Sequence, residues 1–256
     1  FRFEFCIKNK KFNYEQLKEI QDGINQNLKV TYNDPTLSAE KMGIIKNALI
    51  NNIKVNVEDL NFPIKDWHKI EIEKGFNQNI NIIPYISKGL NRQSVQVVMF
   101  ALTKGLKEID NYLNYGFDEN QLYEIYDGLE QGLDVSIYAK TEFNWEQMRE
   151  IRLGLEKNLD VSSYLKLEIN KHQMKEIRKG LEKGLDVSFY AKSDFNCFQM
   201  EEVRLGLEDK LDVSVYAKKE LDWAQMKQIR LGLEKNLDVS LYSSNEFNNR
   251  QMEQVR

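Results

Sequence analysis

Residues 143–165 read FNWEQMREIRLGLEKNLDVSSYL, and residues 169–191 read INKHQMKEIRKGLEKGLDVSFYA. The same register continues toward the end of the chain, so that Gly154, Gly180, Gly206 and Gly232 lie 26 residues apart. A fixed period of this length is typical of solenoids, in which each repeat packs mainly against its neighbours in the chain. The sequence therefore predicts a stack of similar units.

Each repeat begins with the pattern of a helical capping box. Asn144 can accept hydrogen bonds from the first free N–H groups of a helix, and Gln147 can reach back to the cap. Met148, Ile151 and Leu155 then recur at the spacing of one helix face, which predicts a buried stripe. The charged residues are expected mainly on the opposite, solvated face: Glu146, Arg149, Glu150 and Lys157.

The end of each helix is also marked. Asn158 is a residue type that tolerates the left-handed conformation of helix stops, and Asp160 can cap a second, short helical turn. The predicted fold is an all-α solenoid of about nine stacked repeats, each with one long and one short helix. The central glycine costs roughly 1 kcal/mol relative to alanine inside a helix, so we expect a neighbouring segment to approach the backbone there.

The repeats divide the chain into three parts. Residues 1–11 are interpreted as a truncated N-terminal segment, residues 12–116 as divergent repeats, and residues 117–256 as regular 26-residue repeats of which the last is truncated. When the glycine marks each unit, the intervals around Gly105 are irregular, with 30 residues from Gly75 and 23 residues to Gly128. Gly23 and Ala48 mark the two earlier units.

Composition limits the class of protein. Charged residues make up 30% of the chain and no apolar run approaches the length of a membrane span, which predicts a soluble protein without membrane contact. Residues 1–116 carry 16 Lys and Arg against 13 Asp and Glu, and residues 117–256 carry 20 against 27, so neither half has a strong basic excess. Cys6 and Cys197 lie far apart in a linear array, which predicts no disulfide and a reducing compartment.

Two recurrent stripes are candidates for a binding surface. Arg152, Arg178 and their counterparts repeat without change, so we expect them to form ion pairs within and between units. The position before the central glycine does vary, and the residues interpreted there as protein-binding are Leu153, Lys179, Leu205, Leu231, Lys74 and Lys104. A row of exposed leucines would mark an interaction site, although burial against the short helix is the favoured alternative. The recurrent tyrosines, such as Tyr190, are expected in the core.

The sequence offers little support for catalysis. His68 and His172 are the only histidines, and neither has neighbours at the spacing of a metal site or a catalytic triad. The pair Glu201 and Glu202 is interpreted as part of a solvated helix face. We therefore expect a non-enzymatic protein with no metal and no cofactor.

The run from Trp145 to Glu156, followed by Leu159-Asp160-Val161-Ser162, resembles a short helical repeat of uncharacterised proteins from mobile elements and phages of Firmicutes. The resemblance is close over residues 117–256 and loose over residues 12–116. It implies a mobile-element protein that acts in the bacterial cytoplasm, with a host protein such as a defence protein as its target. The resemblance brings no catalytic residues to this chain.

Three functions remain open from the sequence. The first is a scaffold that binds another protein through its variable stripe and its divergent N-terminal repeats. The second is a nucleic-acid-binding solenoid in which Lys8, Lys10 and Lys11 contact phosphates. The third is an architectural protein whose uncapped ends stack on other copies of the chain.

Overall fold

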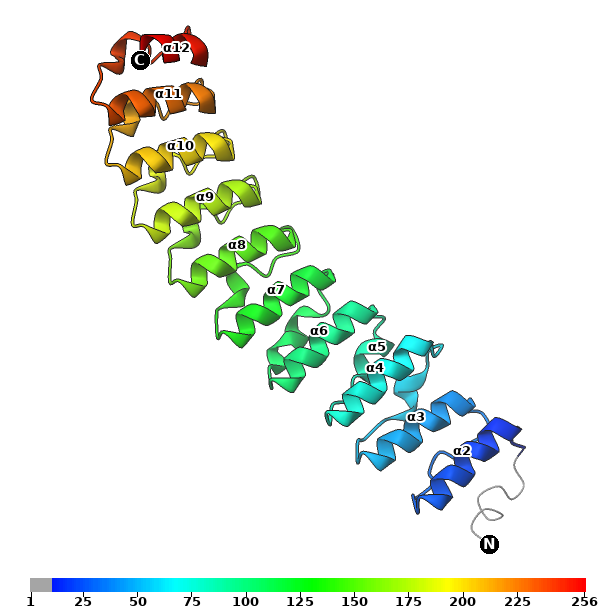
Figure 1. Ribbon diagram of the computed structural model, residues 1–256. Helices are drawn as coiled ribbons and strands as arrows, with labels where there is room; N and C mark the ends of the chain where they lie inside the picture. Colours follow the sequence, from blue (N-terminus) through cyan, green and yellow to red (C-terminus); the bar gives the residue numbers. More distant parts are fainter. Residues whose placement is uncertain (1–10) are drawn as a thin grey trace. The chain divides into compact units, whose positions relative to one another are not determined.

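The computed structural model describes residues 11–256 and has no β-strand among them. It divides into two compact units, Phe1–Tyr126 and Asp127–Arg256. The long helices (Figure 1) are α2 (Tyr14–Asn25), α3 (Ala39–Ile50), α4 (Asp66–Asn77), α6 (Arg92–Thr103), α7 (Glu119–Glu130), α8 (Trp145–Glu156), α9 (Lys171–Glu182), α10 (Cys197–Glu208), α11 (Trp223–Glu234) and α12 (Asn249–Val255). The short helices are η1 (Val57–Leu60), α5 (Ile83–Ser87), η2 (Lys107–Tyr112), η3 (Val135–Ile137), η4 (Val161–Ser163), η5 (Val187–Phe189), η6 (Val213–Val215) and η7 (Val239–Leu241).

Each unit is a helical solenoid. In the first unit α2 contacts α3, α3 contacts α4 and α4 contacts α6, and in the second unit α8 to α12 contact one another in chain order. In the part of the chain that the structure describes, nine long helices have 12 residues each. The predicted all-α solenoid of about nine long-helix and short-helix repeats is thus confirmed.

The predicted capping boxes are present at the start of the helices. In α8 the Gln147 N–H donates to Asn144 Oδ1 at 2.9 Å, and the Asn144 N–H donates to Gln147 Oε1 at 3.1 Å. The α4 cap is reduced, because only the bond from the Lys65 N–H to His68 Nδ1, at 3.0 Å, is of the expected kind. Equivalent two-way boxes begin α2, α9, α10, α11 and α12.

The glutamine of the box also joins adjacent repeats. Gln147 Nε2 donates to the Ile169 carbonyl oxygen at 2.9 Å, and Gln173 Nε2 donates to the Phe195 carbonyl oxygen at 2.5 Å. Both accepting residues precede the cap of the following helix. One buried side chain therefore starts its own helix and fixes the start of the next, which explains why this position repeats as glutamine.

The short helices η3 to η7 are capped as predicted, whereas η1, α5 and η2 have no side-chain cap. Asp160 Oδ1 accepts the Ser162 N–H at 3.0 Å and begins η4. Hydrogen bonds from Ser162 lower the pKa of the Asp160 carboxyl group. The same aspartate and serine begin η3, η5, η6 and η7.

Every 12-residue helix is followed by a C-cap residue and then by a residue with positive φ. These residues are Asn27, Asn52, Asn79, Gly105, Gly132, Asn158, Gly184, Lys210 and Asn236. In α8 the Leu159 N–H then donates to the Gly154 carbonyl oxygen at 3.0 Å, which is the hydrogen bond of a Schellman stop. Lys210, at φ 58°, is the one residue of this set that is neither Asn nor Gly.

We expect Lys210→Gly to raise the free energy of unfolding by about 0.5–1 kcal/mol, because a side chain at positive φ crowds its own backbone. The measurement is urea unfolding followed by circular dichroism. The control is Lys235→Gly at the C-cap of α11, where φ is −89°. Glycine relieves no backbone strain at that φ and increases the conformational entropy of the unfolded chain, so this substitution should destabilise. Equal effects of the two substitutions would contradict this interpretation of Lys210.

The central glycine accommodates a tyrosine hydroxyl. A Cβ atom on Gly180 would overlap the Tyr190 hydroxyl and lie 3.0 Å from Val187 Cγ1. Tyr190 Oη donates to the Glu176 carbonyl oxygen at 3.3 Å, in the turn that precedes the glycine. Burial raises the pKa of Tyr190 well above its ordinary value, so the hydroxyl stays protonated and can donate. The predicted close approach is confirmed, and the approaching group comes from the short helix of the same repeat.

The same overlap occurs wherever glycine and tyrosine occur together, at Gly23, Gly128, Gly154, Gly180, Gly206 and Gly232. At Gly75 the obstacle is the Ile80 carbonyl oxygen, 2.9 Å from a Cβ position. Ala48 stands where no tyrosine follows, since residue 58 is an exposed glutamate. Glycine is thus kept where an oxygen atom passes close to the helix backbone.

The structure corrects the register of the fourth repeat. Gly105 has φ 79° and lies after the end of α6, in the position that Asn158 holds in α8. The central position of α6 is held by Ala101, which is fully buried, ten residues after the cap Asn91. With Ala101 as the marker the irregular intervals of 30 and 23 residues disappear and become 26 and 27. The expected change of repeat length was therefore an error of alignment between two kinds of glycine.

Candidate functional site

Counting residues from the N-cap separates two sets of helix positions. Positions 3, 4, 7 and 10 of α8 are Gln147, Met148, Ile151 and Gly154, and all are buried. Their counterparts in α9 to α11 are of nearly the same types. Positions 1, 2, 5 and 9, which we name the variable face, differ from repeat to repeat. Position 5, for example, is held by Lys18, Gly43, Ile70, Gln96, Tyr123, Arg149, Lys175, Glu201, Lys227 and Glu253.

Large exposed apolar side chains gather on the variable face. Six of those in the described residues lie at its four positions, namely Tyr14, Ile70, Phe100, Tyr123, Phe198 and Trp223. Phe198 of α10 and Trp223 of α11 are 57% and 45% exposed, and their ring centroids are 6.0 Å apart. An exposed aromatic pair between two repeats is typical of a surface that contacts a partner.

The predicted protein-binding residues of the second unit lie at position 9 of the variable face. Leu153, Leu205 and Leu231 are partly buried, so they do not form a fully exposed row. Lys179 is partly buried as well, and its Nζ lies 2.6 Å from Glu176 Oε1. These residues share one position in successive repeats, as the sequence indicated.

The two predicted lysines of the first unit differ from each other. Lys74 is at position 9 of α4, is exposed, and lies 3.3 Å from Glu71 Oε1. Lys104 is the C-cap of α6 and does not belong to the stripe, because the sequence register was wrong in this repeat. Phe100 holds position 9 there and is 51% exposed. Phe100 therefore replaces Lys104 among the candidate residues.

The nucleic-acid candidates are only partly covered. Lys11 is exposed and precedes the cap of α2, whereas Lys8 and Lys10 lie outside the described residues. Cys6 lies outside them as well, and Cys197 is a free, partly buried thiol.

The arginine ladder is paired internally, as expected. Arg178 Nε lies 2.9 Å from Glu150 Oε2 of the preceding helix, and its Nη1 contacts Glu182 of its own helix. Arg204 and Arg230 repeat both contacts. These side chains therefore hold adjacent repeats together.

The acidic partners in this ladder correct the expected solvated face. Glu202 has 9% of its side-chain surface exposed, and its Oε2 lies 2.8 Å from Arg230 Nε. Glu150, which the helix pattern assigned mainly to the outer face, is only 14% exposed. Both carboxylates are covered because the next repeat supplies an arginine, a contact that the periodicity of a single helix does not reveal.

A groove lies between α8 and α9 in the second unit. Its volume is about 410 Å³, and Trp145 and Leu153 contribute apolar walls. Lys171 pairs with Glu146 and Arg178 with Glu150, while Arg149 and Lys175 also line the groove. The groove includes positions 1, 2, 5 and 9 of α8.

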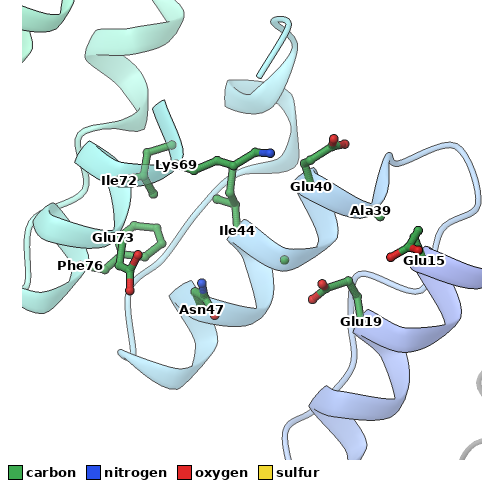
Figure 2. A pocket seen from close by; sticks show the side chains of 11 residues that line it. Glu15, Glu19, Ala39, Glu40, Ile44, Asn47, Lys69, Ile72, Glu73 and Phe76 are labelled. Carbon is green, nitrogen blue, oxygen red and sulfur yellow. The ribbon is translucent and has the colours of Figure 1, made fainter. Parts of the chain in front are cut away.

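A larger groove of about 510 Å³ lies across α2, α3 and α4 in the first unit. Ile44, Ile72 and Phe76 supply its apolar part, and Gly43 leaves room at position 5 of α3. Figure 2 shows carboxylates from all three helices around it, with one lysine at the rim. The charged lining residues are Glu15, Glu19, Glu40, Glu73 and Lys69.

Sequence reasoning missed this acidic groove. Its residues lie in the repeats that were treated as divergent, residues 12–116, where 12 Lys and Arg balance 12 Asp and Glu, so the overall charge gives no sign of an acidic site. A signal was nevertheless present, because Glu73 occupies helix position 8, where Lys46 stands in α3 and Arg178 in α9. Alignment of the repeats on their caps would have shown the reversed charge.

Two kinds of feature are absent from residues 11–256. No group of three or more His, Cys, Asp and Glu side chains there could hold a metal ion. No helix in this range combines the length and the apolar character that crossing a bilayer requires. His68 is buried, and burial lowers the pKa of its imidazole.

Comparison of the chain with protein-family models, with curated proteins and with solved structures found no match.

Proposed function

We propose that the chain is a non-enzymatic scaffold that binds another protein through the variable face of its long helices. The observation that carries the proposal is the contrast between two surfaces of the same helix. Positions 3, 4, 7 and 10 keep nearly the same residues and form the packing, whereas positions 1, 2, 5 and 9 vary and include exposed aromatic side chains such as Phe198 and Trp223. Large apolar side chains are unfavourable on a surface that contacts only water, so their repetition on this face favours a binding surface.

The charge of the first unit favours a protein over a nucleic acid. The groove across α2, α3 and α4 carries the carboxylates of Glu15, Glu40 and Glu73, which would repel phosphate groups. Basic segments and apolar side chains of a protein complement such a groove better. Nucleic-acid binding through Lys8, Lys10 and Lys11 remains the alternative, and its affinity would fall steeply with salt concentration.

The setting of the proposal comes from the resemblance of the repeat to those of mobile-element and phage proteins. We propose a bacterial cytoplasm as the place of action and a host protein, such as a defence protein, as the partner. An inhibitory scaffold needs no catalytic residue, since covering a functional surface of its target is sufficient.

Site-specific photo-crosslinking in the native cell tests the proposal. A photoreactive amino acid is placed at Lys175 or Lys227, both exposed at position 5, and at Ser188 or Ser214, both exposed on short helices as matched controls. We expect crosslinks to one protein from the first pair and not from the second. Crosslinks from the short helices alone, or from none of the four positions, would contradict the proposal.

The products of this experiment also separate the alternatives. Crosslinks to nucleic acid would support the phosphate-binding alternative, and crosslinks between copies of the chain would support an architectural role.

A further inference from the structure

One set of ion pairs between repeats follows a rule of position. A cation at helix position 8 meets a glutamate at position 6 of the preceding helix. In the second unit Arg204 Nε lies 2.8 Å from Glu176 Oε2. In the first unit Lys46 Nζ lies 2.7 Å from Glu19 Oε2. The Lys46–Glu19 pair is therefore equivalent to the arginine–glutamate pairs of the regular repeats, and we call each pair between position 8 and position 6 of the preceding helix a rung.

The rung between α3 and α4 is reversed. Position 6 of α3 is Ile44 and position 8 of α4 is Glu73, so a carboxylate stands where α3 has Lys46 and the regular repeats have arginine. Position 8 carries no charge in α6 and α7, which have Met99 and Tyr126 there. Glu73 is exposed and makes no ion pair with any of residues 11–256. The next rung is not left open in this way, because Glu71 of α4 meets Arg92 Nη2 at 2.8 Å and Gln96 Nε2 at 3.0 Å.

Ile44 and Glu73, the two residues of the reversed rung, both line the groove of Figure 2. Ile44 lies between the carboxylates contributed by the three helices, and Phe76 and Ile72 form the buried floor beneath them, each 2% exposed. Glu15, Glu40 and Glu73 form no ion pair with described residues, whereas Glu19 is paired with Lys46.

The groove keeps its negative charge at neutral pH. Hydrogen bonds from its own backbone N–H and from Ser38 lower the pKa of Glu40. Lys69 is the single cation in the lining, and its charge also lowers the pKa of Glu40, while its Nζ lies 3.8 Å from Asp66 Oδ1. The four glutamates of the lining outnumber this one cation. Carboxylates beside an isoleucine and a phenylalanine are complementary to a long cationic side chain, because its stem is apolar and its end is charged.

We infer that this groove takes an arginine or lysine side chain from an extended, basic and partly apolar segment of the partner protein, whose charge completes the rung at Glu73. The inference rests on the proposed protein-binding function and specifies the chemistry of one contact. The arginine stem lies over Gly43, which has no side chain, and over the small exposed part of Ile44, and its guanidinium group lies between Glu40 and Glu73. Guanidinium is favoured over ammonium because it can bond to two carboxylates with fixed geometry.

Fluorescence anisotropy with defined peptides tests the inference. The probes are a labelled peptide of alternating leucine and arginine and its counterpart in which every arginine is glutamine. We expect the full chain to bind the arginine peptide at least tenfold more tightly at low salt. Equal affinity for the two peptides would overturn the inference.

A double variant places the interaction at the groove. Ile44→Glu with Glu73→Arg rebuilds the rung that Glu176 and Arg204 form, so the chain should remain folded with an undiminished melting temperature. Its affinity for the arginine peptide should fall at least tenfold. Glu253→Arg, at exposed position 5 of α12, is the control for charge reversal and should change the affinity less than twofold. Unchanged binding by the folded double variant would overturn the inference.

The two proposals fail separately. If photo-crosslinks form at Lys175 but the arginine peptide shows no preference, the groove inference is wrong and the binding scaffold stands. If the peptide binds through Glu73 but no partner crosslinks from the variable face, the proposed function is wrong.

Discussion

Gly180→Ala is expected to lower the free energy of unfolding by about 3 kcal/mol, although alanine is the better helix former by roughly 1 kcal/mol. The added Cβ atom would overlap the Tyr190 hydroxyl and lie 3.0 Å from Val187 Cγ1. Tyr190 is fully buried between its helix and its neighbours, so it has no free space to move into. The tyrosine must leave the core or the short helix must separate from α9. Urea unfolding followed by circular dichroism at 222 nm measures the loss.

Two further variants identify the cause of that loss. Tyr190→Phe alone removes the hydrogen bond to the Glu176 carbonyl oxygen and should cost about 1 kcal/mol. In the Gly180→Ala background it should instead recover more than 1 kcal/mol, because the overlapping oxygen atom is gone. Ala48→Gly is the reverse control and should cost no more than the helix propensity of glycine. Additive effects of the two substitutions at 180 and 190 would show that the hydroxyl does not explain the glycine.

Arg230→Met is expected to destabilise the chain by about 3 kcal/mol at neutral pH. Arg230 Nε lies 2.8 Å from Glu202 Oε2, and the two side chains are only 10% and 9% exposed. The substitution keeps an apolar stem of similar length and leaves the Glu202 carboxylate covered without its cation, which is the costly case for a buried pair. Thermal and urea unfolding measure the effect.

The control variants separate the pair from its individual charges. Replacing both partners, as Arg230→Met with Glu202→Leu, should restore most of the lost stability, because two apolar side chains can fill the same space. Lys171→Met breaks the more exposed pair with Glu146 and should cost less than about 1 kcal/mol. If Arg230→Met cost no more than Lys171→Met, the covered rungs would not be what joins the repeats.

Local signals made much of this fold predictable. Asn144 with Gln147 predicts a helix start, Asn158 predicts its stop, and the repetition of both gives the length of each helix. These features act over three to five residues, so they are legible in the sequence of one repeat. The close approach to Gly180 was also predictable, because a glycine inside a helix needs a reason.

Contacts between repeats were harder to predict. Glu150 and Glu202 look like solvated residues on their own helices and are covered only because an arginine 28 residues later reaches back to them. Lys104 was assigned to the binding stripe because Gly105 was taken for the central glycine, and Ala101 in that role gives no glycine signal. The acidic groove was missed for a related reason, since it depends on the replacement of both partners of one rung, Ile44 and Glu73.

The arrangement also explains how such a chain can vary in function. Buried positions, caps and rungs supply most of the contacts that hold each repeat to its neighbours, so we expect substitutions at positions 1, 2, 5 and 9 to disturb the packing less than substitutions at positions 3, 4, 7 and 10. Phe198 with Trp223 offers an apolar contact in the second unit, and Glu40 with Glu73 offers an acidic one in the first. If the proposed function holds, different repeats would contact different parts of one partner.

The central claim is that each repeat is held together by the tyrosine that packs against its central glycine, which we call the tyrosine lock, and is joined to its immediate neighbours by the ion-pair rungs. Hydrogen exchange measured by mass spectrometry on the wild-type chain and on Gly180→Ala tests it most directly. We predict faster amide exchange in α9 and in the adjoining α8 and α10, with unchanged exchange in α2 to α4. An equal increase in all helices would mean that distant repeats share one cooperative core, and no increase in α9 would mean that the lock does not hold the repeat; either result would contradict the account.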